Sequence, residues 1–469
     1  MAEDNTTILS VGAECTISGA PEPLRKIITT KLTCENPQYR DAKKYGRWVG
    51  KRLKPQLYFF REEPDGSLII PRGYARQAVY TCRNYLGTER LQIKDQRREV
   101  KKINFTFIGE LRPYQKKARD EVLQNEFGVL ESGTGSGKTV IALAVIAARK
   151  QPTLILVHTK ELLYQWVEKI QTFLDMRAGM IGDGHFDVQP ITVAIVNSAR
   201  RRLQDLPGQF GQICVDECHR VPATLFTDVV TAFDCRFMLG LSATAYRRDG
   251  LTCLIYYYLG ERAWRIDPQE LESSGAVLKP EFIQKETGFT YVYRGDYQDL
   301  MKALTGSKTR NQRIIEDILT EAEKGRRTVL VVSDRVAHCE ALVKGIAERD
   351  INGRFRTAML TGKMKADERS QLVEAIHNGA VDILIATLQL IGEGFDCPGL
   401  RVLILTTPIK FTGRLLQVVG RVLRPEQGKK PVVYDYIDQC GLLQKSARER
   451  RQVFEDEEDI QEMLFSMRE

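Results

Sequence analysis

At 469 residues the chain is too long for one hydrophobic core, and a typical domain size of about 150 residues predicts three units. Its composition, 43% hydrophobic and 28% charged, is that of a globular protein, and no run approaches the roughly 20 apolar residues of a membrane span. The first residues lack the basic and apolar regions of a signal peptide, so we expect a cytoplasmic protein, in the host cytoplasm if it is viral. The ten cysteines are scattered singly, which predicts buried, reduced thiols and no metal cluster.

The first 110 residues carry almost all of the net charge. They hold 20 Lys and Arg against 13 Asp and Glu, a balance of +7 out of the +8 of the whole chain. A basic module attached to a nearly neutral body is typical of binding to a phosphate backbone, although a solvated basic face would have the same composition. Within this module the segments PQLYFFREE and SLIIPRG, separated by the turn residues PDG, predict a β-hairpin.

Short apolar runs alternate with amphipathic stretches from about residue 127 onward, a pattern typical of parallel sheets covered by helices on both faces. The predicted strands of a first sheet are 127–131, 153–158, 191–196, 212–217 and 236–244, and those of a second are 328–333, 357–360, 382–387, 401–406 and 432–437. The rhythm is lost between residues 250 and 310, so we place a domain boundary near residue 277. The sequence thus predicts an α/β protein with two tandem parallel-sheet domains behind a small N-terminal α+β module.

A glycine-rich loop, SGTGSGKT, follows the first of these strands and precedes a helical stretch, which is the order that a phosphate-binding P-loop requires. Its glycines would let backbone N–H groups converge on phosphate oxygens, Lys138 would reach the β- and γ-phosphates, and Thr139 would bind Mg²⁺. Ser132 stands where the strict pattern has glycine, and a purely structural turn is the alternative. The residues expected to cradle ATP are Ser132, Gly133, Thr134, Gly135, Ser136, Gly137, Lys138 and Thr139.

An acidic pair ends another predicted strand, in the segment QICVDECH. Asp216 is suited to hold Mg²⁺ through water, and Glu217 is suited to polarise the attacking water. An acidic pair on an exposed loop would carry little information, but a pair that ends a buried strand after a P-loop predicts an ATPase. The expected cofactors are therefore ATP and Mg²⁺.

With these motifs the chain resembles the superfamily 2 helicases, and the similarity extends in order from residue 111 to the second sheet. LRPYQ is similar to the adenine-reading segment of that family, which places Arg112 and Gln115 at the base. DECH and LSAT are similar to the segments that couple hydrolysis to strand engagement, which assigns coupling to His219, Ser242 and Thr244. The resemblance implies two RecA-like domains.

Two later segments resemble the part of the ATP site that the second domain supplies. IATLQLIGEGFDCP is similar to a segment that places Gly394 and Asp396 at the nucleotide, and QVVGRVLRP is similar to the arginine-finger segment, with Gln417, Arg421 and Arg424. A guanidinium from a second domain stabilises charge on the γ-phosphate only when the domains close, so closure and hydrolysis are expected to be one event. A surface ion pair is the alternative for either arginine.

By the same resemblance, nucleic acid is expected to lie across both domains. Small hydroxyl residues and backbone amides suit phosphate oxygens, which carry no sequence information. Each hydroxyl residue could equally be a helix cap. The candidates are Thr159, Lys160, Asn197, Ser198 and Arg247 in the first domain, and Ser333, Arg335, Thr361, Gly362 and Thr387 in the second.

The segment AYRRDG resembles the Arg-Glu-Asp signature of the XPB-like and UvsW-like group, with Arg248 in place of the expected Glu. KTRNQRI and the DECH form also fit this group better than the DEAD-box RNA helicases. The resemblance therefore implies an ATP-dependent DNA helicase or translocase that remodels branched or forked duplexes, working as a monomeric motor. The alternatives are an RNA helicase and an ATP-gated clamp that holds nucleic acid without moving.

The segments NPQYRDAKKYGRW and LIIPRGYARQ resemble the amino-terminal module of UvsW-like helicases. Such a module would grip duplex DNA through basic residues and stack a splayed base on an aromatic ring, unless the aromatics are core and the charges solvated. The basic candidates are Arg40, Lys43, Lys44, Arg47, Lys51 and Arg52, and the aromatic ones Tyr39, Tyr45, Trp48 and Tyr74. The expected domains are residues 1–105 (basic module), 106–277 and 278–445 (RecA-like domains) and 446–469 (charged helical tail).

Overall fold

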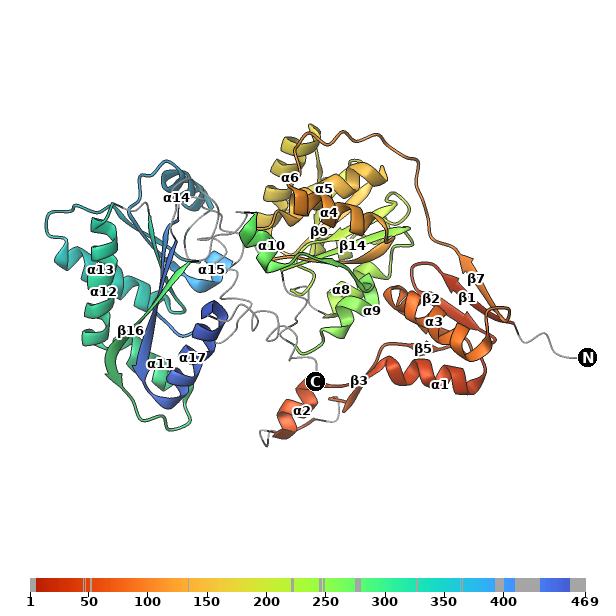
Figure 1. Cartoon of the computed structure of the whole chain (residues 1–469), viewed down its shortest axis with the longest axis horizontal. Helices are drawn as coiled ribbons and strands as arrows, with labels where there is room; N and C mark the ends of the chain where they lie inside the picture. The colour runs from red at the N-terminus through yellow and green to blue at the C-terminus, as the bar shows by residue number, and fades with distance from the viewer. Residues whose placement is uncertain are drawn as a thin grey trace, which may run out of the picture. The chain divides into compact units, whose positions relative to one another are not determined.

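The computed structural model describes residues 6–455 apart from short gaps. The gaps are residues 45, 47, 51–52, 134, 221–222, 244–246, 248, 275–279, 326–327, 363, 365, 393–399 and 410–430. The chain divides into two compact units, residues 1–132 with 137–267 and residues 133–136 with 268–469, whose elements are labelled in Figure 1. Among the described helices, none is both long and apolar enough to cross a membrane.

The first unit begins with a small α+β module. Its sheet has the order β5-β6-β2-β1-β7, in which β1 and β7 are parallel and the other neighbours antiparallel. Alternate residues of β1 and β2 point inward against α1 and α3, which gives the module a core of its own. The elements are β1 (Thr7–Val11), β2 (Cys15–Ser18), α1 (Glu22–Lys31), β3 (Thr33–Glu35), α2 (Pro37–Lys44), β4 (Gln56–Tyr58), β5 (Arg61–Glu62), β6 (Leu68–Ile70), α3 (Ala75–Leu86) and β7 (Leu91–Asp95). The antiparallel pair β5–β6 confirms the predicted hairpin, whereas β4 pairs with β3.

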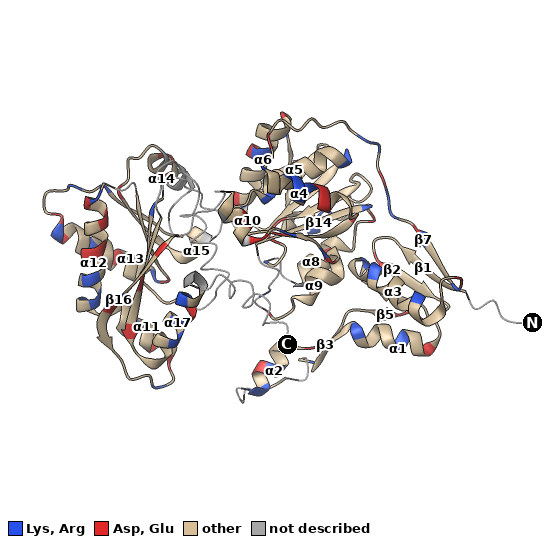
Figure 2. Ribbon diagram, in the orientation of Figure 1, with Lys and Arg blue, Asp and Glu red and all other residues tan. Residues whose placement is uncertain are grey.

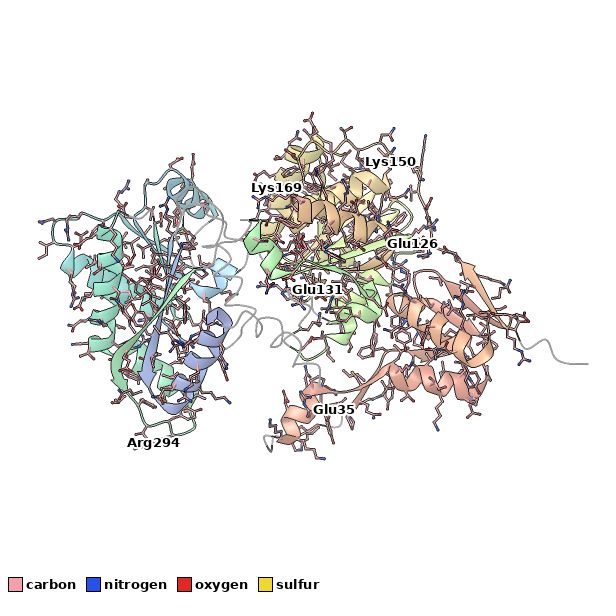
Figure 3. The ribbon with its side chains drawn as sticks, viewed as in Figure 1. Glu35, Glu126, Glu131, Lys150, Lys169 and Arg294 are labelled. Atoms are coloured by element: carbon pink, nitrogen blue, oxygen red, sulfur yellow. The ribbon has the colours of Figure 1, made fainter. Side chains whose placement is uncertain are left out.

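The rest of the first unit is a largely parallel sheet of order β11-β10-β12-β9-β13-β14-β8-β15. Its strands are β8 (Phe127–Glu131), β9 (Thr153–Val157), β10 (Gly179–Gly182), β11 (His185–Asp187), β12 (Ile191–Ile195), β13 (Gln212–Val215), β14 (Phe237–Ser242) and β15 (Arg262–Arg265). Its helices are α4 (Pro113–Leu123), α5 (Lys138–Arg149), α6 (Lys160–Leu174), α7 (Val196–Arg200), α8 (Ala223–Val230) and α9 (Cys253–Leu259). Because β13, β14 and β8 are adjacent and parallel, the segments that follow them emerge at one edge of the sheet. Glu131, labelled in Figure 3, is the last residue of β8. Its carboxylate accepts a hydrogen bond from the hydroxyl of Tyr256 at 2.6 Å.

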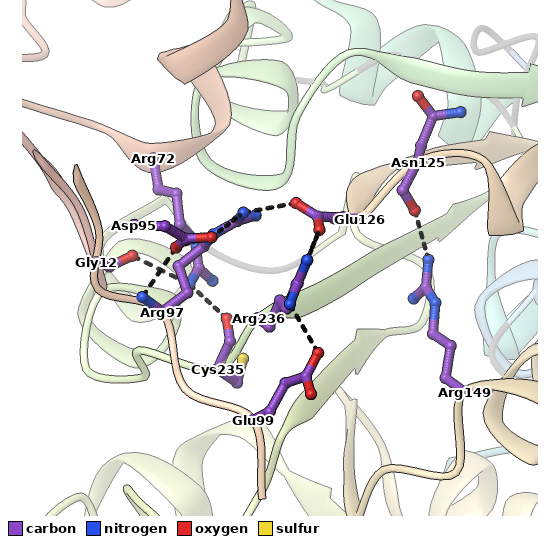
Figure 4. A network of polar contacts seen from close by, with 10 residues as sticks. All are labelled: Gly12, Arg72, Asp95, Arg97, Glu99, Asn125, Glu126, Arg149, Cys235 and Arg236. Carbon is purple, nitrogen blue, oxygen red and sulfur yellow. Dashed lines mark hydrogen bonds and ion pairs between the residues drawn. The ribbon is translucent and has the colours of Figure 1, made fainter. Parts of the chain in front are cut away.

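The N-terminal module is anchored to this sheet by the buried Arg72, which is 2% exposed. Its guanidinium donates to the carbonyl oxygen of Gly12 in the module at 3.2 Å and to that of Cys235 beside the sheet at 2.7 Å (Figure 4). The next residue, Gly73, lies so close to the sheet domain that a Cβ there would be 2.4 Å from the backbone nitrogen of Gly260. Both contacts join main chains across the boundary, so module and first sheet form one unit.

A second set of contacts follows where the chain leaves the module. Arg236, at the start of β14, pairs with Glu99 at 2.8 Å and with Glu126 at 2.6 Å, and Arg97 pairs with the same Glu126 (Figure 4). The backbone of Arg98 bridges that of Cys235 as a short parallel pair. These contacts fix the direction in which the chain enters the parallel sheet.

The second unit is a parallel sheet of order β16-β21-β20-β17-β19-β18. Its strands are β16 (Glu281–Thr290), β17 (Val329–Ser333), β18 (Thr357–Leu360), β19 (Ile383–Thr387), β20 (Val402–Leu405) and β21 (Val432–Gln439). Its helices are α10 (Pro268–Ser273), α11 (Tyr297–Gly306), α12 (Lys308–Glu323), α13 (Val336–Arg349), α14 (Ala366–His377), α15 (Leu388–Gly392) and α17 (Gly441–Glu455). The buried ion pair Arg310–Asp438, at 2.8 Å, ties α12 to the end of β21. The predicted α/β fold with two parallel sheets is confirmed.

The predicted strands of the two parallel sheets are all present within about two residues, while β1, β2, β3 and β7 of the N-terminal module and four described strands of the parallel sheets were not expected. Of the latter, β16 is an edge strand whose exposed and half-buried residues form no continuous apolar run, and β10, β11 and β15 are short. The boundary predicted near residue 277 falls on residues outside the described part, and α17 runs without a break through residue 445. The four predicted domain ranges remain predictions.

We expect Arg72→Met to loosen the module from the sheet domain, because two buried carbonyl oxygens would lose a charged donor at a cost of about 2–4 kcal/mol. The measurements are the thermal midpoint and the rate of tryptic cleavage at Lys101 and Lys102, in the segment after β7. Arg76→Met is the matched control. The Arg76 side chain is 74% exposed, and its 3.8 Å ion pair with Glu261 lies at the surface, where such pairs contribute little to stability. Equal cleavage rates in the two variants would contradict this anchoring role.

Candidate active site

The glycine-rich loop joins β8 to α5, as predicted. Gly135 and Gly137 have φ of 88° and 81°, values that residues with a side chain rarely adopt. Lys138 is the first residue of α5, and its ammonium donates to the carbonyl oxygen of Ser132 at 2.9 Å. The backbone nitrogen of Ser132 donates to the carbonyl oxygen of Ser242 at 3.0 Å, which ties the loop to β14. Thr134 lies outside the described residues.

The predicted adenine-reading residues lie beside this loop. Arg112 caps α4 and its backbone nitrogen donates to the side-chain oxygen of Gln115 at 3.0 Å. The amide nitrogen of Gln115 lies so close to Gly137 that a Cβ there would be only 2.4 Å from it. Glycine at 137 is favoured by its φ, and the approach of Gln115 shows that the structure brings the two motifs together.

The acidic pair lies at the end of β13. Asp216 is 6% exposed, and its two carboxylate oxygens accept from the indole N–H of Trp166 at 2.8 Å and from the backbone N–H of Glu217 at 2.9 Å. Burial and the charge of Glu217 raise the pKa of Asp216 to about 6. Burial also opposes ionisation of Glu217, but the positive charges of Lys138 and Arg220 help to outweigh it and lower the pKa of that carboxyl. With one pKa of about 6 and the other below its ordinary value, both carboxyl groups are largely ionised at neutral pH.

Glu217 also has a strained backbone, with φ of 47° in the left-handed region. A residue with a side chain pays of the order of 1 kcal/mol or more for this conformation, which persists only where the surroundings hold it. Here the next residue, Cys218, donates its backbone N–H to the carbonyl oxygen of Leu241 in β14 at 3.1 Å. Strain of this kind is typical of residues whose direction matters for function.

The two coupling residues that the structure describes are in direct contact. The Nδ1 atom of His219 lies 2.9 Å from the hydroxyl of Ser242 and 3.4 Å from a carboxylate oxygen of Glu217. Burial lowers the pKa of His219 to about 4, so the ring is neutral near pH 7. One neutral ring therefore connects the carboxylate of Glu217 with the end of β14. Thr244 lies outside the described residues.

The side chains at this edge fit ATP with Mg²⁺. A carboxylate has about four acceptor positions, so Asp216 keeps free lone pairs beside its two donors, and the hydroxyl of Thr139 lies in the first turn of α5. Oxygen ligands of this kind suit Mg²⁺, and the ammonium of Lys138 with the loop amides suits phosphate oxygens. Five residues predicted to contact the nucleotide from the second domain lie outside the described residues, so their place in the site stays a prediction. They are Gly394, Asp396, Gln417, Arg421 and Arg424.

The candidates for nucleic-acid contact in the first unit have different surroundings. Thr159 caps α6 by accepting from the backbone N–H of Leu162 at 3.3 Å, which is the alternative that the sequence left open. Lys160 is exposed and pairs with Asp183, and Asn197 is exposed and Ser198 half-buried on α7. Arg247 is 2% exposed, with its guanidinium on Asp249 at 2.6 Å. The Arg247 guanidinium is therefore buried against a half-buried Asp249, and its contact with nucleic acid stays a prediction.

The second unit offers an exposed Gly362 and an exposed Arg335, and a half-buried Thr387 at the end of β19. Thr361 is 7% exposed. Ser333 is fully buried, and its hydroxyl lies 3.0 Å from Nδ1 of His338. A direct strand contact through the Ser333 hydroxyl is therefore corrected, since that group is used inside the fold.

In the N-terminal module the aromatic candidates differ in their exposure to solvent. Tyr74 is 2% exposed and packs edge-on against Tyr257 at 5.8 Å, so it is core and not a stacking platform. Trp48 is 89% exposed, and Lys43 and Lys44 are exposed at the end of α2, where the ribbon is blue in Figure 2. Tyr39 is half-buried and Arg40 is exposed, within 4.0 Å of Glu35. Tyr45, Arg47, Lys51 and Arg52 lie outside the described residues.

Two family models match the chain: the type III restriction enzyme res subunit on residues 108–247 and the helicase conserved C-terminal domain on residues 310–426. The chain is 26% identical to the DNA 3'-5' translocase XPB2 of Sulfurisphaera tokodaii, over 73% of this chain and 85% of that protein. It is 25% identical to the ATP-dependent DNA helicase uvsW of Enterobacteria phage T4, over 89% of this chain and 86% of that protein. This chain belongs to the superfamily 2 helicases, of the XPB and UvsW type.

One further relative and one solved structure are similar to this helicase. The probable helicase D10 of Escherichia phage T5 is 26% identical over 68% of this chain and 70% of that protein. The crystal structure of T4 UvsW aligns with this chain over 96% of this chain and 97% of the UvsW chain, with a TM-score of 0.42 and 19% identity. The two matched family models and the helicase relatives make this chain an ATP-dependent helicase, and its P-loop and acidic pair lie within the first model.

One residue of the site was not expected from the sequence of the helicase. Trp166 ends the segment LVHTKELLYQW, which also holds the candidates Thr159 and Lys160, but an aromatic residue spaced with Leu163 and Ile170 on one face of α6 has the pattern of a core position. Periodicity identifies the buried face and not the partner of the indole N–H. A buried tryptophan needs an acceptor, and that requirement was the available signal.

We expect Ser242→Ala to reduce the stimulation of ATP hydrolysis by nucleic acid roughly five-fold, because the loss of a hydrogen bond to His219 is worth about 1 kcal/mol. Hydrolysis rates with and without nucleic acid measure this effect. Thr153→Ala is the control, since Thr153 begins β9 at the opposite edge of the sheet and its hydroxyl donates only to the carbonyl of Gln151. Undiminished stimulation in the Ser242 variant would show that this contact does not couple the two sites.

Proposed function

We propose that this helicase is an ATP-driven DNA translocase that remodels forked or branched duplexes. The observation that carries the motor part is the neutral His219, which touches both Glu217 and Ser242. ATP hydrolysis, in which Glu217 orients the attacking water, is then linked through His219 to the end of β14. The residues at this end of β14 resemble the segment that couples hydrolysis to engagement of the nucleic-acid strand. The names of the relatives, a DNA translocase and a DNA helicase, support DNA as the substrate.

In this proposal each residue of the first unit has a chemical task. The loop amides and Lys138 bind the phosphates, and Thr139 and Asp216 hold Mg²⁺, which neutralises phosphate charge when it is bound. Glu217, ionised at neutral pH, accepts a hydrogen bond from the attacking water and orients it. Arg421 and Arg424 are proposed to act on the γ-phosphate from the second RecA-like domain, with Gln417 beside them.

The docked N-terminal module supports the preference for forks and branches. Arg72 and the close approach at Gly73 make it move with the first RecA-like domain, so any DNA bound by its exposed Lys43, Lys44 and Trp48 is held at a fixed place on the motor. Two linked contacts to one substrate raise affinity only if the substrate reaches both. A forked or branched molecule reaches two differently placed sites more readily than a straight duplex does.

We expect Lys138→Ala and Glu217→Gln each to lower DNA-stimulated ATP hydrolysis by at least about 100-fold, as removal of a group that stabilises the transition state does. Glu217→Gln should still bind ATP, because it keeps the loop and Lys138. Steady-state hydrolysis with fork DNA, with structured RNA and without nucleic acid measures both points. Equal wild-type turnover in all three conditions would refute a nucleic-acid-dependent motor, and stimulation by RNA alone would favour an RNA helicase.

We expect the double change Lys43→Glu and Lys44→Glu to weaken binding to a forked duplex and to flatten its salt dependence, because two phosphate contacts are lost. Lys26→Glu is the control, since Lys26 is an exposed lysine on α1 of the same module. Branch migration and fork regression are compared with simple unwinding for each variant. Binding without any displacement of a third strand would identify a clamp in place of a translocase.

A further inference from the structure

The indole of Trp166 makes a contact that the proposed chemistry does not yet use. Trp166 is 1% exposed in α6, and its N–H donates to one oxygen of the Asp216 carboxylate at 2.8 Å. The other oxygen accepts the backbone N–H of Glu217 at 2.9 Å. Each oxygen therefore has its own donor, and the two donors come from different elements of the fold. Together they fix both the direction and the rotation of the carboxylate.

Such fixing matters for a magnesium ligand. Mg²⁺ requires nearly octahedral geometry with oxygens at about 2.0–2.1 Å, so a carboxylate that can rotate binds it less well. Asp216 also lies within electrostatic reach of Lys138, which attracts it in the absence of a cation. A donor that holds the carboxylate in place before the metal arrives removes that competing orientation. Groups that orient a metal ligand typically change metal affinity by about 10–100-fold.

The choice of tryptophan is informative. An indole N–H is a neutral donor that cannot accept and does not titrate, so it holds Asp216 without reducing its negative charge. A lysine or arginine at the same place would neutralise the carboxylate and weaken its attraction for a cation. The ring is in turn fixed by α6, whose neighbouring buried residues Leu163 and Ile170 are fully excluded from solvent.

We propose that Trp166 is a positioning residue for magnesium: its indole N–H holds the Asp216 carboxylate in the orientation that binds the ion with ATP. The inference rests on the proposed ATP site and adds a partner to it. If Trp166 is only structural, its replacement lowers the stability of the fold equally with and without Mg²⁺. If it positions Asp216, its replacement weakens the increase in nucleotide affinity that Mg²⁺ produces.

The test uses the full chain and a fluorescent, non-hydrolysable ATP analogue, titrated with MgCl₂ or held in EDTA. For Trp166→Phe we expect the affinity for the analogue in EDTA to stay within about two-fold of wild type. The Mg²⁺ concentration that produces half of the Mg²⁺-dependent increase in affinity should rise about ten-fold. Ile170→Ala is the matched control: it removes core packing one turn along the same helix, so it should lower the thermal midpoint without moving the Mg²⁺ requirement. An unchanged Mg²⁺ requirement in Trp166→Phe, or an equal shift in Ile170→Ala, overturns the proposal.

Asp216→Ala separates this inference from the function on which it rests. If Mg²⁺ strengthens analogue binding equally in wild type and Asp216→Ala, the proposed metal site itself is wrong; if only Asp216→Ala loses the gain, Trp166 alone is misassigned.

A second measurement keeps Trp166 in place, in case its replacement unfolds the chain. The protein has three tryptophans, so Trp48→Phe with Trp264→Phe leaves Trp166 as the sole indole reporter. Addition of Mg²⁺ to the analogue complex should change Trp166 emission, and Asp216→Ala should abolish that change. Emission that is identical before and after Mg²⁺ overturns the proposal.

Discussion

The side-by-side order of three parallel strands, β13, β14 and β8, is the constraint on which the ATP site depends. Parallel strands point their carboxyl ends in one direction, so the acidic pair, Ser242 and the glycine loop must emerge at one edge. Two backbone hydrogen bonds then connect them, from Ser132 to Ser242 and from Cys218 to Leu241. The edge is a connected set of main chains before any side chain acts. This explains how a displacement at one strand end can be felt at the others.

Burial sets the charge states on that edge. Asp216, Glu217 and His219 share one small buried volume, and desolvation alone would make all three neutral. Of the two acids, only Glu217 has its pKa lowered, with Lys138 among the causes, and only Asp216 has both oxygens occupied by N–H donors. The Asp216 carboxylate is therefore held at both oxygens, whereas that of Glu217 is not. Two adjacent acids of similar chemistry thus acquire different tasks from their surroundings.

Much of the fold and of the ATP site followed from sequence patterns with a direct physical cause. Strands buried on both faces appear as continuous apolar runs, and a loop whose backbone binds phosphate appears as spaced glycines. The rest depended on side-chain direction, which such patterns do not contain. β16 forms no continuous apolar run, Tyr74 and Arg247 point inward, and Trp166 has the spacing of a core residue. Each required knowledge of which groups face one another in three dimensions.

The anchor at Arg72 has a consequence for comparing this chain with its relatives. Its acceptors are the main-chain oxygens of Gly12 and Cys235, which every residue type provides. An ion pair between two side chains ties two positions together, so that a change at one favours a change at the other. Arg72 imposes no such tie, because its partners keep their oxygens whatever side chains they carry. Covariation between aligned sequences would therefore miss this junction, although it fixes one domain on another.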